Sequence, residues 1–194
     1  PAFFGCNPDN MGEYDLVVIS PGVSPDLSFL QEARLSGVEV IGELELAYRL
    51  SKGTFIAITG TNGKTTTTTL VGKIFEKAHR KTAVVGNIGV AVVSKALEST
   101  EDEWMVTEAS SFQLETVKEF HAKVSAILNL TPDHLNRHKT MEAYGAAKAQ
   151  VFRNQDENDY LVINYDDKTC FALAEKCKAT VVPFSRKEEL EMGA

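Results

Sequence analysis

The chain has 194 residues, of which 43% are hydrophobic and 24% charged, a composition that fits a folded globular protein and excludes a disordered or fibrous chain. Its formal net charge of −7, without interleaved basic and aromatic residues, argues against a nucleic-acid partner. The longest apolar stretches, such as residues 16–19 and 54–58, are too short to cross a bilayer. The amino end also has no basic segment leading into an apolar one, so we expect a cytoplasmic protein without a membrane segment.

The first fifty residues predict two pairs of a strand and a helix. These elements lie at residues 15–20 (strand), 25–36 (helix), 38–41 (strand) and 43–50 (helix). Gly37 is suited to end the first helix, because glycine adopts a left-handed conformation easily. The polar run 51–53 follows the second helix, and we expect a domain boundary there, with one domain over residues 1–52 and another over residues 53–194.

Beyond that boundary the pattern restarts with a strand over residues 55–59, a glycine-containing turn and a helix over residues 65–78. The helix places four apolar residues on one face: Leu70, Val71, Ile74 and Phe75. Residues 65–69 are five threonines, which are poor helix formers, so we expect packing of this apolar face to hold the helix.

The rest of the chain continues the alternation. Further strands are predicted at residues 82–85, 104–107, 124–128, 160–163 and 180–182, and helices at about 140–153 and 167–177. This order predicts an α/β fold, with a mainly parallel sheet flanked by helices and with ligands at the carboxyl ends of the strands.

The turn that opens the long helix has the composition of a phosphate-binding loop. Its residues are Gly60, Thr61, Asn62, Gly63, Lys64, Thr65 and Thr66. The full pattern would require glycine where this chain has Ile58, so the match is to the shorter form Gly-x-x-Gly-Lys-Ser/Thr. Glycines let the backbone approach phosphate, Lys64 can neutralise its charge, and Thr65 offers a hydroxyl to Mg²⁺. The alternative, an ordinary turn with a solvated lysine, explains the order of strand, glycines, lysine and threonine less well.

An acidic residue follows the strand predicted over residues 104–107. Glu108 stands at the strand end, where a carboxylate beside the phosphate loop can coordinate Mg²⁺ directly. Glu115 is one or two helical turns further on and is less suited to this role. Taken alone, Glu108 is equally well explained as an acid that interacts with a helix dipole.

A histidine-bearing segment follows the strand predicted over residues 124–128. Asp133, His134 and His138 are groups that can bind metal, although a single histidine is more often structural and His138 can simply be solvated. Lys148 lies in an apolar helical stretch, where spacing alone favours a surface lysine. The cysteines form no CxxC cluster and are expected to be reduced, without a zinc site: Cys6, Cys170 and Cys177.

Taken together, these stretches resemble the Mur ligase superfamily, whose members join amino acids to a UDP-linked muramic acid. The matching stretches are residues 60–65 (the ATP loop), 86–89 (a substrate-side loop), 129–137 (the histidine-bearing loop) and 144–148 (the helix of a modified lysine). The run Ser110-Ser111-Phe112-Gln113-Leu114-Glu115 is most similar to the D-glutamate-adding branch. Residues 20–24 resemble the end of the family's N-terminal domain. The resemblance extends to about residue 163.

This resemblance implies an ATP-dependent amide ligase that adds D-glutamate to UDP-N-acetylmuramoyl-L-alanine through an acyl phosphate, in peptidoglycan synthesis. Residues 1–52 would be the last part of a Rossmann-like domain for the UDP substrate, and residues 53–194 would be part of a P-loop-containing central domain. The uridine-binding loops and the C-terminal amino-acid-binding domain would be absent from the chain, so we expect the chain alone to be inactive. The full protein is expected to be a monomer.

The resemblance also implies roles for individual residues. The catalytic residues would be Lys64, His134 and Lys148. One Mg²⁺ would be held by Thr65 and Glu108, and a second by His134 and Lys148 in its carbamylated form. The substrate would be bound by Ser20, Pro21, Gly22, Asn87, Gln113 and His134, and Asp133 would support the metal and nucleotide region.

Two other classes of protein would carry some of these sequence features. A different Mur ligase or a folylpolyglutamate synthase would share the phosphate loop and the lysine but not the run over residues 110–115. From another class, a phosphate-loop module of a nucleotide switch or a transporter ATPase would share the loop alone. The amino acid that stimulates ATP turnover distinguishes the first alternative, and neighbouring membrane or receptor domains would indicate the second.

Overall fold

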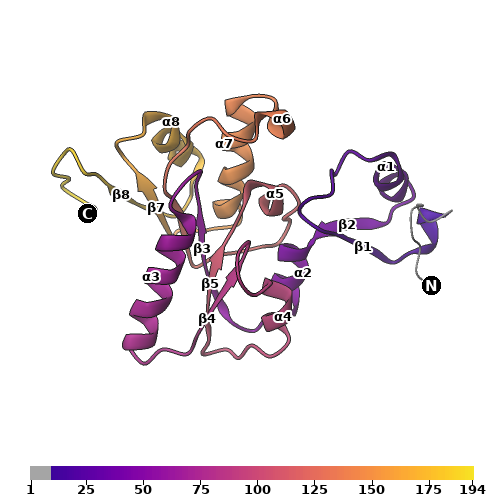
Figure 1. Ribbon diagram of the computed structural model, residues 1–194, viewed down its shortest axis with the longest axis horizontal. Helices are drawn as coiled ribbons and strands as arrows, with labels where there is room; N and C mark the ends of the chain where they lie inside the picture. Colours follow the sequence, from indigo (N-terminus) through magenta and orange to yellow (C-terminus); the bar gives the residue numbers. More distant parts are fainter. Residues whose placement is uncertain (1–9) are drawn as a thin grey trace.

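The structure is a computed structural model that describes residues 10–194, and it contains two parallel sheets (Figure 1). The smaller sheet pairs β1 (Leu16–Ile19) with β2 (Glu39–Gly42), which are connected through α1 (Ser28–Leu35). The larger sheet has the order β4-β5-β3-β6-β7-β8. Its strands are β3 (Thr54–Thr59), β4 (Thr82–Gly86), β5 (Trp104–Glu108), β6 (Val124–Ile127), β7 (Tyr160–Asn164) and β8 (Thr180–Phe184). All of these pairings are parallel, which confirms the predicted fold class.

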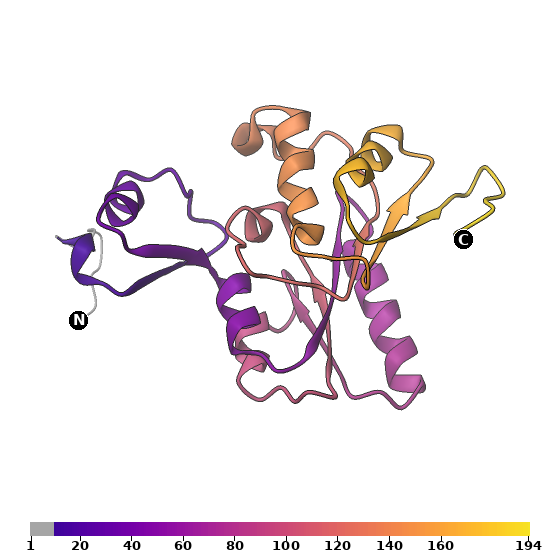
Figure 2. The ribbon, with the colours of Figure 1, turned by 180° about the vertical axis from the view of Figure 1, so that it is seen from behind.

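Helices cover both faces of the larger sheet, as Figure 2 shows from the opposite side. The α-helices that follow β2 are α2 (Glu43–Leu50), α3 (Lys64–Lys77), α4 (Val92–Ala96), α5 (Ser111–Leu114), α6 (Leu135–His138), α7 (Met141–Ala149) and α8 (Lys168–Phe171). Three short 3₁₀ helices complete the elements: η1 (Met11–Glu13), η2 (Gln150–Phe152) and η3 (Ala172–Lys176). The segment predicted as one helix over residues 167–177 is therefore α8 followed by η3.

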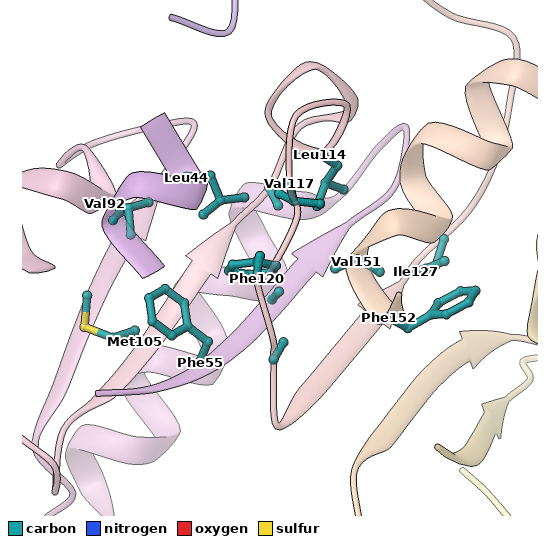
Figure 3. Packing of buried hydrophobic residues seen from close by; sticks show 14 of the residues in the cluster. Leu44, Phe55, Val92, Met105, Leu114, Val117, Phe120, Ile127, Val151 and Phe152 are labelled. Atoms are coloured by element: carbon teal, nitrogen blue, oxygen red, sulfur yellow. The ribbon is translucent and has the colours of Figure 1, made fainter. Parts of the chain in front are cut away.

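Alternate residues of β3 contribute to two different cores, because successive side chains of a strand point to opposite faces. Phe55 and Ala57 belong to the larger core, shared with α2, α4, α5 and α7. Figure 3 shows this core, in which the rings of Phe55 and Phe120 meet edge to face with centroids 5.5 Å apart. Ile56 and Ile58 point to the smaller core, against α3. The sheet is therefore buried on both faces, and its polar residues reach ligands mainly where the strands end.

Helix α3 packs through a face that differs from the predicted one. Val71 and Phe75 contact the smaller core as predicted, but Leu70 and Ile74 are 58% and 55% exposed, so the prediction that they pack was wrong. Gly72 takes one of the buried positions instead. A Cβ at Gly72 would collide with a methyl group of Val84, so the glycine lets the helix approach β4 closely without moving that side chain. The spacing of apolar residues predicted that α3 has an apolar face, but it did not predict how the helix is rotated about its axis relative to the sheet.

Helix α2 ties the smaller sheet to the larger core. Leu44 and Ala47 are buried in the larger core, although α2 directly follows β2. Glu45 is fully buried and accepts hydrogen bonds of 2.8–3.1 Å from three successive backbone N–H groups: Lys118, Glu119 and Phe120. Arg49 donates to Glu45 and, through both terminal nitrogens, to Glu39 of β2. The domain boundary at residue 52 stays a prediction.

The structure also bears on the predictions for Gly37, for the cysteines and for a membrane segment. Gly37 has a φ of +81° directly after α1, as predicted for a glycine that ends a helix. Cys170 and Cys177 are free, while Cys6 lies outside the described residues. Within residues 10–194, no helix combines the length and the apolar character that a membrane span requires.

Candidate active site

Most of the predicted site residues lie at one edge of the larger sheet, where its parallel strands end. The loop of residues 60–63 follows β3, Asn87 follows β4, Glu108 closes β5, and residues 129–134 follow β6. Because β4, β5, β3 and β6 are consecutive neighbours in the sheet, their carboxyl ends bring these segments side by side. This is the edge at which parallel α/β sheets bind ligands.

The loop after β3 turns on two glycines. Gly60 has a φ of +146° and Gly63 a φ of +83°, both in the region that favours glycine. A Cβ at Gly60 would also come within 3.1 Å of the Leu128 Cβ, so the loop approaches the next strand closely. Gly63 is the N-cap of the 14-residue helix α3, whose first backbone N–H groups have no partner within the helix. Such a helix start binds anions, and phosphate in particular.

Lys64 is half-buried at the beginning of α3. Its Nζ donates to the carbonyl oxygens of Gly60 (3.0 Å) and Thr61 (2.8 Å), so the ammonium group is held over the loop. The loop residues line a pocket of about 300 Å³ together with Asn87, Ile88 and Glu108. The geometry therefore places one cationic side chain and a free helix start at the same pocket, which suits the binding of a polyphosphate.

Glu108 is the buried acid of this pocket, at 2% exposure. Its Oε2 accepts a hydrogen bond from the Thr65 hydroxyl (2.8 Å), and its Oε1 accepts one from the Asn87 amide (3.2 Å). Both donors are uncharged, so a cation bound at this carboxylate would add the charge complement that they do not supply. Mg²⁺ prefers carboxylate and hydroxyl oxygens. Glu108 and Thr65 present both at the pocket wall, so they fit a Mg²⁺ ion.

A clamp from the segment after β6 fixes the phosphate loop. The side-chain amide of Asn129 accepts from the backbone N–H of Asn62 (2.8 Å) and donates to its carbonyl oxygen (3.0 Å). Next to it, the Thr61 hydroxyl donates to the carbonyl oxygen of Thr131 (3.1 Å) and accepts from its N–H (3.0 Å). Neither Asn129 nor Thr131 is among the site residues predicted from the sequence. The sequence signal that could have identified them is their place directly after the strand predicted over residues 124–128, which lies beside β3 in the sheet.

Lys148 of α7 is buried at 1% exposure, so the surface position that its spacing in the sequence favoured is wrong. Its Nζ donates to the carbonyl oxygen of Gly60 (2.8 Å) and lies 4.6 Å from the ring centroid of Tyr144. Burial, followed by repulsion from Lys64, lowers the pKa of Lys148 to about 7. A lowered pKa favours the neutral amine, which is the form that reacts with CO₂ to give a carbamate.

His134 lies beside the same tyrosine. Its ring centroid is 6.3 Å from that of Tyr144, and its side chain is 47% exposed. Asp133 accepts a hydrogen bond from the backbone N–H of His134 (2.8 Å), which orients this turn. Within the described part of the chain, no three His, Cys, Asp or Glu side chains form a metal-binding group.

The predicted substrate residues lie on both sides of a narrow crevice. Ser20 and Pro21, in the loop after β1, face Phe112 and Gln113 across a space that is too narrow to admit a water molecule. The Oε1 of Gln113 accepts from the backbone N–H (3.0 Å) and the hydroxyl (3.1 Å) of Ser110 and so caps α5. The side-chain oxygen of Gln113 therefore already accepts two hydrogen bonds from within the protein. Contacts of these residues, of Gly22 and of Asn87 with a substrate stay predictions.

The comparison with known families agrees with this geometry. The Mur ligase middle domain matches residues 58–193, a range that includes the phosphate loop, Glu108, His134 and Lys148. The chain belongs to the Mur ligase family. The resemblance inferred from the sequence is therefore confirmed at the level of the family.

Individual Mur ligases match nearly the whole chain. The UDP-N-acetylmuramoylalanine–D-glutamate ligase of Alkaliphilus metalliredigens is 57% identical over 183 residues, which are 94% of this chain and 40% of that protein. The ligase of the same name from Alkaliphilus oremlandii is 60% identical over 179 residues, 92% of this chain and 39% of that protein. Among solved structures, the MurF ligase of Thermotoga maritima in complex with ADP is similar with a TM-score of 0.59 at 20% identity, over 92% of this chain and 50% of that one. This chain spans about two fifths of the length of the two curated relatives.

Proposed function

We propose that the protein carrying this chain is an ATP-dependent ligase that joins D-glutamate to UDP-N-acetylmuramoyl-L-alanine in peptidoglycan synthesis. The observation that carries the proposal is the 57% identity, over 94% of this chain, with a ligase named for D-glutamate. The pocket formed by the phosphate loop, Thr65 and Glu108 supports the use of ATP, because it offers backbone N–H groups, a lysine and a carboxylate together.

The proposed reaction has two steps. The alanine carboxylate of the UDP-linked substrate attacks the γ-phosphorus of ATP, the bond to the β,γ-bridging oxygen breaks, and ADP leaves while an acyl phosphate forms. The amine of D-glutamate then attacks the acyl carbon, phosphate leaves, and the amide forms as the amine loses a proton. Such chemistry depends on positioning and on neutralising phosphate charge. In this chain the start of α3 and Lys64 would bind the phosphates.

We assign two Mg²⁺ ions to this site. Glu108 and Thr65 would hold the first, and His134 with carbamylated Lys148 would hold the second. Bound Mg²⁺ would offset the negative charge of the phosphates during transfer. The carbamate is supported by the burial of Lys148 and by its pKa of about 7, because a neutral amine reacts with CO₂ and the product offers the oxygen ligands that Mg²⁺ prefers.

We further assign residues 1–52 to the end of a domain that binds the UDP substrate, and residues 53–194 to part of the central ATP-binding domain. Ser20, Pro21, Gly22, Asn87 and Gln113 would contact the substrate, and Asp133 would support His134. D-glutamate would be bound by a further domain, because the relatives are more than twice as long as this chain. We expect the complete protein to act as a monomer in the cytoplasm.

A panel of amino acids tests this proposal. The complete protein is given ATP, Mg²⁺ and UDP-N-acetylmuramoyl-L-alanine, and phosphate release is measured with D-glutamate, L-glutamate, L-alanine and meso-diaminopimelate in turn. We expect D-glutamate to stimulate release most strongly. Stimulation by another amino acid would remove the D-glutamate specificity but would still support a Mur ligase. Release that is independent of every amino acid and of the UDP substrate would favour a nucleotide switch or an ATPase module instead.

A further inference from the structure

A buried polar network joins three segments that the proposed function places around the UDP substrate. His138 of α6 lies between Ser111, whose Oγ is 2.9 Å from its Nε2, and Glu115, whose Oε1 is 3.2 Å from its Nδ1. The other oxygen of Glu115 accepts from Arg137 Nη2 (2.7 Å). The same nitrogen donates to the carbonyl oxygen of Val23 (3.3 Å), in the loop that follows β1. The network therefore runs from α5 through α6 to the loop between β1 and α1.

The network is not a second catalytic centre. Its order of serine, histidine and carboxylate is that of a nucleophilic triad, but Ser111 is 2% exposed and His138 is 7% exposed. No reactant can therefore reach the hydroxyl. Aromatic packing adds to this enclosure, because Phe112 stacks on His138 with centroids 5.5 Å apart and the Arg137 guanidinium lies 5.1 Å from the centroid of the Phe112 ring. These contacts indicate a structural function for the network.

Helix α6 needs such support, because it is only four residues long and cannot form alone. Its N-cap His134 has a φ of +51° and its C-cap Lys139 a φ of +70°, both in the left-handed region that is strained for residues other than glycine. Strain of this kind persists only where the surroundings hold it. His138 is the buried residue of α6, and its contacts with Ser111, Glu115 and Phe112 tie the turn carrying His134 to α5 and the residue that follows it.

We propose that Glu115, Arg137 and His138 are positioning residues that set His134 and the loop of residues 20–24 relative to each other for the UDP-linked substrate. The inference rests on the proposed function, because that function makes these two segments substrate-binding. The contacts of Asn129 and Thr131 that hold the phosphate loop involve none of these three residues. Disrupting the network should therefore weaken binding of the UDP substrate and leave binding of ATP nearly unchanged.

Two variants of the complete protein test this inference. His138→Phe keeps the aromatic packing but removes both ring nitrogens, and Glu115→Gln keeps the side-chain size but removes the charge that faces Arg137. His121→Phe is the matched control, because His121 also pairs with a carboxylate, Asp159 at 2.6 Å, but lies just before β6 at the other end of the sheet. The measurements are the Kd of UDP-N-acetylmuramoyl-L-alanine by calorimetry without ATP, the KM values of both substrates, and the melting temperature.

We expect His138→Phe and Glu115→Gln to raise the Kd and KM of the UDP substrate by about tenfold, the effect of losing about 1.4 kcal/mol of binding energy. The KM of ATP should change less than about twofold, and His121→Phe should change neither value. Unchanged binding of the UDP substrate in both variants, or an equal rise of both KM values with a fall in melting temperature, would overturn the inference. If His138→Phe does not fold, Glu115→Gln decides alone.

The same experiment separates this inference from the proposed function. Wild-type protein that binds the UDP substrate but requires another amino acid would remove the D-glutamate assignment, while the two KM values would still decide whether the network positions the substrate. Wild-type protein that binds no UDP-linked substrate would overturn both.

Discussion

Replacing Lys148 with methionine should stabilise the folded chain, although the proposed reaction needs this lysine. Lys148 is buried at 1% exposure and has Lys64 among the charges that act on it. Its Nζ donates to the carbonyl oxygen of Gly60 and lies 4.6 Å from the Tyr144 ring centroid, and neither contact is with a carboxylate. A buried cation with so little compensation destabilises the folded state, and methionine fills a similar volume without a charge.

The size of the effect follows from the pKa. Burial lowers the pKa of Lys148 from its ordinary value of 10.5 to about 7, and each pKa unit corresponds to about 1.4 kcal/mol, so the charged lysine lowers the free energy of unfolding by about 5 kcal/mol below pH 7. The folded pKa lies below the unfolded one. The unfolded chain therefore binds more protons between pH 7 and 10.5, and the stability of the wild type rises with pH in this window. Methionine loses a hydrogen bond worth about 1–3 kcal/mol, which leaves a net gain of about 2–4 kcal/mol at pH 6.

Urea unfolding of the 194-residue chain at pH 6 and pH 9, in buffer free of CO₂, measures this effect. The advantage of Lys148→Met should shrink by about 3 kcal/mol between pH 6 and pH 9, because the wild type becomes more stable as Lys148 deprotonates in the folded state. Lys73→Met is the control, since Lys73 is 66% exposed, and it should change stability by less than about 0.5 kcal/mol. A Lys148→Met chain that is less stable than the wild type at pH 6, or a difference that does not change with pH, would refute the reasoning.

Three further predictions concern the phosphate loop and its surroundings in the complete protein. Lys64→Ala should abolish ADP release, because Lys64 is the cation that the loop holds in place; near-normal turnover would remove the loop assignment. Glu108→Gln, which keeps a hydrogen-bond acceptor for Thr65, should raise the Mg²⁺ concentration for half-maximal turnover by about tenfold or more, and an unchanged requirement in a Mg²⁺ titration would argue against this ligand. Asn129→Ala should raise the KM of ATP by up to about thirtyfold, since two hydrogen bonds of about 1 kcal/mol each hold Asn62. Asn154→Ala removes an amide that bridges Lys118 and Phe120 away from the loop, so it should leave the KM of ATP unchanged; equal effects of the two variants would contradict a specific clamp.

Local patterns in the sequence were sufficient to predict much of the fold. The alternation of strands and helices implied a parallel sheet, because parallel neighbours need helical connections between them. The phosphate loop could be recognised because Gly60 and Gly63 occupy positions where the backbone has a positive φ, and Lys64 and Thr65 follow at fixed positions. These features depend on residues that are close together in the chain.

Features that depend on distant segments could not be predicted in the same way. The burial of Lys148 and its bond to Gly60 join residues 88 positions apart, and the clamp of Asn129 on Asn62 spans 67 positions. The rotation of α3, which leaves Leu70 exposed, depends on how closely Gly72 lets the helix approach β4. Such contacts are decided by tertiary packing, and the spacing of residues along one segment does not encode them.

The transfer of an isotope label tests the proposed ligase reaction most directly. The complete protein is incubated with ATP, Mg²⁺, D-glutamate and UDP-N-acetylmuramoyl-L-alanine that carries ¹⁸O in its alanine carboxylate, and the released phosphate is analysed by mass spectrometry. If the carboxylate attacks the γ-phosphorus, each phosphate released should contain one labelled oxygen, and its release should require D-glutamate. Phosphate without the label, released at the same rate when D-glutamate is omitted, would mean that water attacks ATP and would contradict the proposed ligase function.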